Sequence, residues 1–135
     1  MNPNKAIYYI LANDATVSGI VSNRIYQLRA EQGAPYPLVM IQKISDVPYS
    51  DDIRNSLFRA RIQVNSYHTN YNDAHRLATA CMNALDGVRT QTVNAVNVIE
   101  IEIENETDLI EDFSEFDGLF HVAQDYFIVY QRIAS

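Results

Sequence analysis

The chain has 135 residues, of which 47% are hydrophobic and 20% charged, and it carries a net charge of −7. This length and composition predict one globular domain over residues 1–135, and no segment approaches the roughly 20 consecutive apolar residues of a membrane-spanning helix. The acidic balance argues against a surface that holds DNA by its phosphates, and the first residues lack the order of a signal peptide, so we expect residence in a cytoplasm.

Two short helices are predicted at the start of the chain. Residues 4–13 carry apolar side chains at helical spacing, and a second short helix follows from Asp14 to Val21. Asp14 has a suitable side chain to cap that second helix. The next segments are predicted to be, in order, a strand at 24–28, a Pro/Gly loop at 33–37, a strand at 38–44 and an exposed loop at 45–52.

A long strand is predicted over residues 57–67. Its side chains alternate, with Ala60, Ile62 and Val64 expected to face the core. Arg59 and Arg61 are then expected to face the other side, together with Gln63. The strand therefore predicts a basic row on one face of a sheet.

The clearest helical pattern runs from Asn70 to Leu85. Asn70 can cap its start, and Asp86 followed by Gly87 supplies a stop at its end. One stripe of the helix is apolar and is expected to be buried: Ala74, Leu77, Ala78, Cys81 and Leu85.

Residues 98–104 alternate strictly between β-branched and acidic side chains, which is typical of a half-buried strand. Ile99, Ile101 and Ile103 are expected to face the core. The acidic ladder, defined as Glu100, Glu102 and Glu104, is expected to face the other side without needing individual partners. The ladder belongs to a wider asymmetry, because nine basic and seven acidic residues precede position 90, whereas ten acidic residues and one basic residue follow it.

The end of the chain is predicted to be a polar connection over 105–116, a turn at Asp117 and Gly118, and a strand over 119–133. Scattered apolar anchors are expected in the connection: Leu109, Ile110 and Phe113. Helices, strands, a helix and further strands in this order predict a single α+β domain, a mostly antiparallel sheet with helices packed on one face.

No catalytic, cofactor-binding or metal-binding residues are predicted. The three histidines lack the spacing of a zinc site, and Asp108, Glu111 and Asp112 lack the glycine and spacing of a calcium loop. Cys81 and His75 would lie about 120° apart around their helix, so Cys81 is expected to be a core residue. An alternative remains open, a small α+β ligand-binding or metal-dependent enzymatic domain, whose pocket aromatic residues would line: Tyr67, Tyr71, Tyr126 and Phe127.

The order of elements, with particular residues in them, resembles the tail-completion (tail-terminator) family of long-tailed bacteriophages and prophages. The likeness covers nearly the whole chain. It is carried by residues 24–26 (Arg-Ile-Tyr), 33–39 (Gly-Ala-Pro-Tyr-Pro-Leu-Val), 58–64 (Phe-Arg-Ala-Arg-Ile-Gln-Val), 71–78 (Tyr-Asn-Asp-Ala-His-Arg-Leu-Ala), 84–87 (Ala-Leu-Asp-Gly) and 124–130 (Gln-Asp-Tyr-Phe-Ile-Val-Tyr).

This resemblance implies a structural, non-enzymatic protein of the virion tail, without cofactors, made in the host cytoplasm. Members of the family are expected to form a ring, usually of six subunits, that caps the head-proximal end of the tail tube and provides the head-tail joining surface. The implied partners are copies of the chain, the tail tube protein and a neck or head-completion protein, while DNA passes through without specific binding. Six copies would carry about −42, a self-repulsion that favours monomers in free solution.

Within this interpretation, two groups of residues are candidates for contacts. The loop that holds Pro48, Tyr49, Asp51 and Asp52 is the candidate partner-contact element, because Pro48 and Tyr49 offer rigid and aromatic surface. The acidic ladder could line the channel. Arg59 and Arg61 could meet acidic residues of a neighbouring subunit, although both charged faces could equally be solvated.

Overall fold

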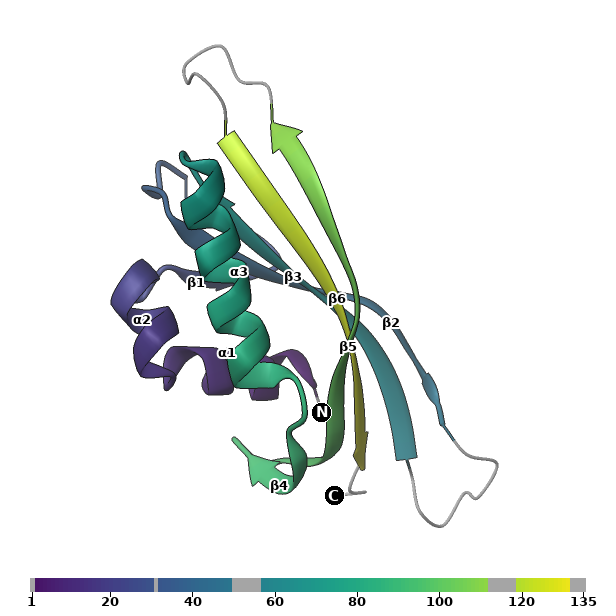
Figure 1. The fold of residues 1–135 in the computed structure, drawn as a ribbon. Helices are drawn as coiled ribbons and strands as arrows, with labels where there is room; N and C mark the ends of the chain where they lie inside the picture. The colour runs from purple at the N-terminus through teal and green to yellow at the C-terminus, as the bar shows by residue number, and fades with distance from the viewer. Residues whose placement is uncertain (1, 31, 50–56, 112–118, 132–135) are drawn as a thin grey trace.

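The computed structural model describes residues 2–30, 32–49, 57–111 and 119–131. Three helices pack on one face of a twisted six-stranded sheet, which is the predicted α+β architecture (Figure 1). The elements are α1 (Asn4–Ala12), α2 (Ala15–Val21), β1 (Ile25–Gln27), β2 (Leu38–Pro48), β3 (Leu57–His68), α3 (Tyr71–Leu85), β4 (Arg89–Val93), β5 (Val96–Glu111) and β6 (Leu119–Gln131). Among them no helix is long and apolar enough to cross a membrane.

The strand order in the sheet is β1-β2-β3-β6-β5-β4. β1 pairs with β2 in parallel, and the other neighbours are antiparallel. The central pair, β3 with β6, runs without a bulge from Leu57 opposite Gln131 to His68 opposite Phe120. This regular pairing joins the middle of the chain to its C-terminal strand.

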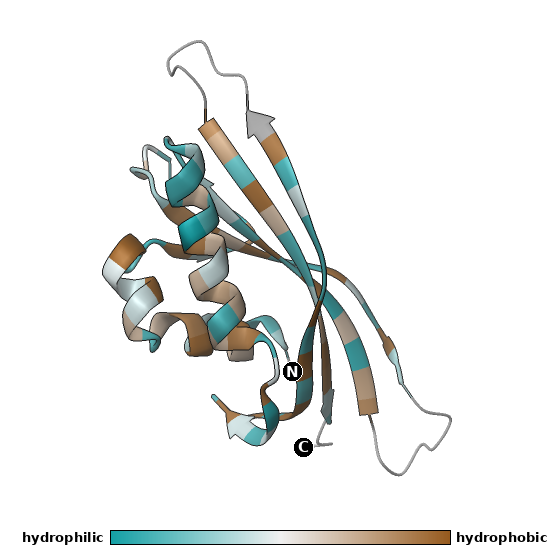
Figure 2. Ribbon diagram, in the orientation of Figure 1, coloured by the Kyte–Doolittle hydropathy of each residue, from teal (hydrophilic) through white to brown (hydrophobic). Residues whose placement is uncertain are grey.

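The core lies between the sheet and the helices. As predicted, Ala60, Ile62 and Val64 of β3 are fully buried, and alternate residues of β6 join them. Figure 2 shows apolar and polar residues following one another along the visible parts of β3 and β6. The apolar residues of one face pack against α1 and α3, for example against Ile7 and Leu77. Alternate side chains of the central strands point to the opposite face, which none of the described helices covers (Figure 1).

The predicted helices and caps are confirmed. The Asp14 side chain accepts hydrogen bonds from the backbone N–H groups of Thr16 and Val17, each at 3.0 Å. Asn70 accepts from the backbone N–H of Asp73 at 3.0 Å. The whole predicted apolar stripe of α3 is buried.

Two segments that were predicted as connections are strands. Residues 45–48, predicted as a loop, extend β2, and residues 105–111, predicted as a polar connection, extend β5. Each extension pairs with a neighbouring strand, residues 45–48 with β3 and residues 105–111 with β6. These backbone hydrogen bonds outweigh the weak strand propensity of the polar residues. The β4 strand was not predicted.

The prediction that Ile99 faces the core is wrong. A register shift between Val98 and Glu100 places a bulge at Ile99, so Val98 and Ile101 are buried whereas Ile99 is 36% exposed. Leu109, predicted as an apolar anchor, is 43% exposed. The expectations for Phe113, the turn at 117–118 and the final residues 132–133 fall outside the described residues.

Candidate functional site

The candidate site is the helix-free face of the sheet. Residues that lie opposite each other on paired strands point to the same face, so register assigns its members. Arg59 lies opposite Val129, which lies opposite Glu100. The helix-free face comprises Arg59, Arg61 and Gln63 of β3, Asp125, Phe127 and Val129 of β6, and Glu100, Glu102 and Glu104 of β5. The basic row and the acidic ladder, predicted separately, thus flank one central strand.

Arg61 is tied to acidic residues of its own chain. Its Nη2 lies 2.8 Å from Oδ2 of Asp125, and its Nη1 lies 3.9 Å from Oε2 of Glu104. Gln63 donates to the other oxygen of Asp125 at 3.2 Å. The hydrogen bond from Arg61 to Asp125, followed by the charges of Asp125 and Glu104, raises the pKa of the guanidinium, which therefore stays charged.

Arg59 contacts an aromatic ring instead of a carboxylate. Its guanidinium carbon lies 3.7 Å from the centroid of the Phe127 ring, a cation–π geometry. Within the described part of the chain Arg59 forms no ion pair. Among the described residues, its charge is therefore the less compensated of the two on β3.

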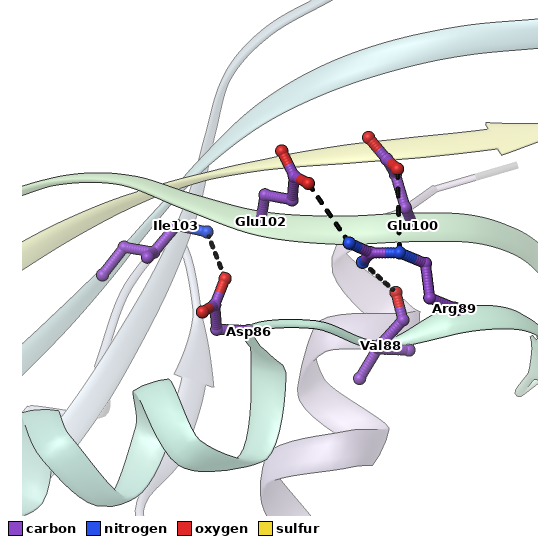
Figure 3. Close-up of polar contacts among 6 residues, drawn as sticks. All are labelled: Asp86, Val88, Arg89, Glu100, Glu102 and Ile103. Atoms are coloured by element: carbon purple, nitrogen blue, oxygen red, sulfur yellow. Dashed lines mark hydrogen bonds and ion pairs between the residues drawn. The ribbon is translucent and has the colours of Figure 1, made fainter.

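The acidic ladder is partly neutralised by arginines, contrary to the expectation that its members need no partners. Arg89 of β4 reaches over β5, with its Nη2 3.2 Å from Oε1 of Glu102 and its Nε 3.9 Å from Oε2 of Glu100 (Figure 3). Glu104 has Arg61 at 3.9 Å. Exposed pairs of this kind contribute about 0 to 1 kcal/mol each, so they organise the surface more than they stabilise it.

A shallow depression of about 410 Å³ lies at the β2 end of the helix-free face. It brings together four residues that were predicted as candidates from separate segments, Pro48, Tyr49, Arg59 and Arg61. The candidates Asp51 and Asp52 lie outside the described residues. The other members of the lining are Ser45, Val47 and Phe127. Ser45 and Val47 belong to the segment 45–52 that was predicted as the contact loop, whereas Phe127 was expected only in the aromatic pocket of the alternative interpretation.

The described residues offer little for catalysis. They contain no group of three or more His, Cys, Asp or Glu side chains that could hold a metal ion. Cys81 is buried, and burial raises the pKa of its thiol to about 12, so it is not a nucleophile at neutral pH. His75 Nε2 lies 2.8 Å from a carboxylate oxygen of Asp108, and the Tyr71 hydroxyl donates to the other oxygen at 2.8 Å. This hydrogen bond raises the pKa of Tyr71 and leaves Asp108 as a link between α3 and β5.

The aromatic pocket of the alternative interpretation does not form. Tyr126 is buried in the core on the helix side, and its hydroxyl donates to Gln124. Phe127, the next residue, lies on the opposite face under Arg59. The two side chains therefore cannot line one pocket.

Comparison with known proteins assigns the chain to a family. The family model described as tail completion protein gp17 matches residues 5–131. The chain belongs to this tail completion family. No curated protein sequence matches it.

The tail completion fold is shared with a chain from the structure described as "Virion of native gene transfer agent (GTA) particle". That chain superposes with a TM-score of 0.67 at 14% sequence identity, over 94% of this chain and 92% of the other. At this identity the likeness shows the fold alone. Membership of the tail completion family makes this chain a structural protein of the virion tail.

Proposed function

We propose that the chain forms a ring, of six copies, that caps the head-proximal end of the tail tube, stops tube growth and offers the surface to which the head is joined. The observation that carries the proposal is the match of the tail completion family over residues 5–131. The site supports it, because the described candidate residues form an open, charged surface with a shallow depression. Its partners are copies of the chain, the tail tube protein and a neck or head-completion protein.

The acidic ladder is proposed to line the channel of the ring. Glu100, Glu102 and Glu104 lie on one face of β5, and two arginines only partly neutralise them. A negative wall repels DNA phosphates and lets DNA slide without specific binding. The net charge of −7 on each copy opposes assembly in free solution, which supports monomers that join into a ring on a tube end.

The residues around the depression are proposed as the contact element for the tube or the neck. Val47 and Tyr49 are each 52% exposed, although both are apolar or aromatic. Arg59 and Arg61 add positive charge beside them, which suits an acidic and apolar surface on a partner.

Removal of the gene from its phage or prophage tests the proposal. We expect filled heads and unattached, overlong tails in electron micrographs, because nothing would stop tube growth or join the two parts. Normal joined particles after removal would reject the proposal.

Complementation of the removed gene tests the contact element. The parent chain and Tyr9→Ala should restore joined particles, since Tyr9 is a comparably exposed tyrosine on α1. Tyr49→Ala should restore fewer joined particles. Equal restoration by Tyr49→Ala and Tyr9→Ala would remove Tyr49 from the proposed contact.

A further inference from the structure

No described strand pairs with the outer edge of β2 over residues 43–47. β1 covers β2 only from Val39 to Ile41, and one further hydrogen bond joins the N–H of Leu28 to the carbonyl of Ile41 at 2.7 Å. On its inner edge, β2 continues to pair with β3 as far as Pro48. Within the described residues, therefore, one side of this segment has no strand beside it.

The outer edge of β5 has no strand partner among the described residues over positions 104–111. Upstream, β4 pairs with β5, the backbones of Gly87 and Val88 bond to Ile101, and Asp86 accepts from the N–H of Ile103 at 2.9 Å. Beyond Ile103 no described strand lies on that side, while β6 pairs with the inner side as far as Glu111. Figure 1 shows this part of β5 as a free border of the sheet.

Open strand edges present unpaired N–H and C=O groups that recruit another strand unless they are protected. We propose that residues 43–47 of one copy pair with residues 104–111 of a second copy, so that the sheet continues from subunit to subunit. This inference rests on the proposed function, because a closed ring needs two different surfaces on each subunit. β2 and β5 run in opposite directions in the sheet, so a continuing sheet makes the new pair antiparallel.

The side chains at the two edges suit each other. Ile44 and Val47 are 48% and 52% exposed on β2, and Leu109 is 43% exposed on β5, so pairing would cover apolar surface of both copies. Arg59, which forms no ion pair with a described residue, lies across from Val47, and Glu104 lies on the other edge. The chain therefore carries both of the complementary edges, so a second copy suits the β2 edge better than an unrelated peptide does.

Engineered cysteines test the pairing directly. Ser45 and Thr107 are exposed, and both lie on the helix-free side of their strands. Directly opposite residues on antiparallel strands have Cα atoms about 4.5–5.5 Å apart, within the range of a disulfide. We expect Ser45→Cys combined with Thr107→Cys to give disulfide-linked oligomers after oxidation on isolated tail tubes, at least tenfold more than Thr16→Cys with Thr107→Cys.

Two neighbouring positions allow for a shift in register. Ser45→Cys is also combined with Asn105→Cys and with Leu109→Cys, and one of the three pairs should cross-link. Cys81 is buried and is expected to stay unreacted. Cross-linking at control level for all three pairs, in rings that electron microscopy shows to be assembled, would overturn the inference and leave the proposed function standing.

Glutamates on the β2 edge provide a second test, because they would face the acidic residues Glu104, Glu106 and Asp108 of the second copy and repel them. Ile44→Glu combined with Val47→Glu should reduce occupied tube ends at least tenfold. Tyr9→Glu, at a 48% exposed position on α1, should not reduce them. Occupation of tube ends at the parent level by the folded double variant would overturn the inference, whereas a parent chain that never binds tube ends would overturn the proposed function and the inference with it.

Discussion

The side chain of Gln124 offers a stringent test of how β6 is joined to its neighbours. Gln124 is fully buried, and its Nε2 donates to the carbonyl of Ala78 in α3 at 3.0 Å and to Oε1 of Glu106 in β5 at 2.8 Å. Its Oε1 accepts from the buried hydroxyl of Tyr126 at 2.8 Å. One amide therefore connects three elements of the fold.

Gln124→Met keeps the length of the side chain but removes its polar atoms. The hydroxyl of Tyr126 then loses its acceptor, and leaving a buried donor without one costs about 1–3 kcal/mol. Glu106 is exposed and can turn to water, so its share of the loss is small. We expect the free energy of unfolding to fall by about 1–3 kcal/mol, and the melting temperature by about 3–10 °C.

Urea denaturation of Gln124→Met, Tyr126→Phe and the double variant forms a double-mutant cycle, which measures the interaction energy between these two side chains. Tyr126→Phe alone should also destabilise the fold, because it leaves the Gln124 oxygen without its donor, and the double variant should lose less than the sum of the two single variants by about 0.5–3 kcal/mol. Gln42→Met, at an exposed position on β2, should change stability by less than about 0.5 kcal/mol. Additive losses in the cycle would refute the assignment of this hydrogen bond.

Two further predictions concern Cys81 and Asp14. Burial raises the pKa of the Cys81 thiol from 9.0 to about 12, so the stability that the protonated thiol contributes is complete below pH 9 and is lost between pH 9 and pH 12. Urea denaturation measures the difference in the free energy of unfolding between the parent chain and Cys81→Ala. This difference should fall by about 1.4 kcal/mol from pH 8 to pH 10, because only the parent chain has a thiol whose contribution is lost as the pH rises. A difference that stays constant would contradict the burial of the thiol. Asp14→Ala removes the cap of α2 and should lower the free energy of unfolding by about 0.5–2 kcal/mol. Asp14→Asn, which retains an acceptor, should cost less, and equal losses in the two variants would argue against capping.

Local patterns predicted much of the fold correctly. The alternation in β3 placed Ala60, Ile62 and Val64 in the core, and the apolar stripe of α3 predicted the buried face of that helix. The caps at Asp14 and Asn70 were also correct, because each depends on one side chain and the backbone two or three residues away. Interactions over so few residues leave a clear sequence signal.

The candidate site was predicted only in parts. Arg59, Arg61 and the acidic ladder were each expected to point away from the core. Register places Arg59, Arg61, Glu100 and Glu102 on the helix-free face, and the contact with Arg61 places Glu104 there. Their mutual arrangement could not be predicted, because Arg89 and Glu102 meet only after β4 folds back on β5. The depression that joins Pro48 and Tyr49 to the arginines likewise requires β2 to pair with β3 beyond the predicted end of the strand.

The amino-acid order alone thus established the helices, most of the strands, the inward side of β3 and the family resemblance, since each depends on spacing along the chain. Tertiary structure decided the bulge that turns Ile99 outward, the extra length of β2 and β5, and the two strand edges that no described strand covers. The physical reason is that strand pairing joins residues far apart in sequence. A shift of one position in such a pairing turns every following side chain to the other face, and spacing within one strand does not reveal it.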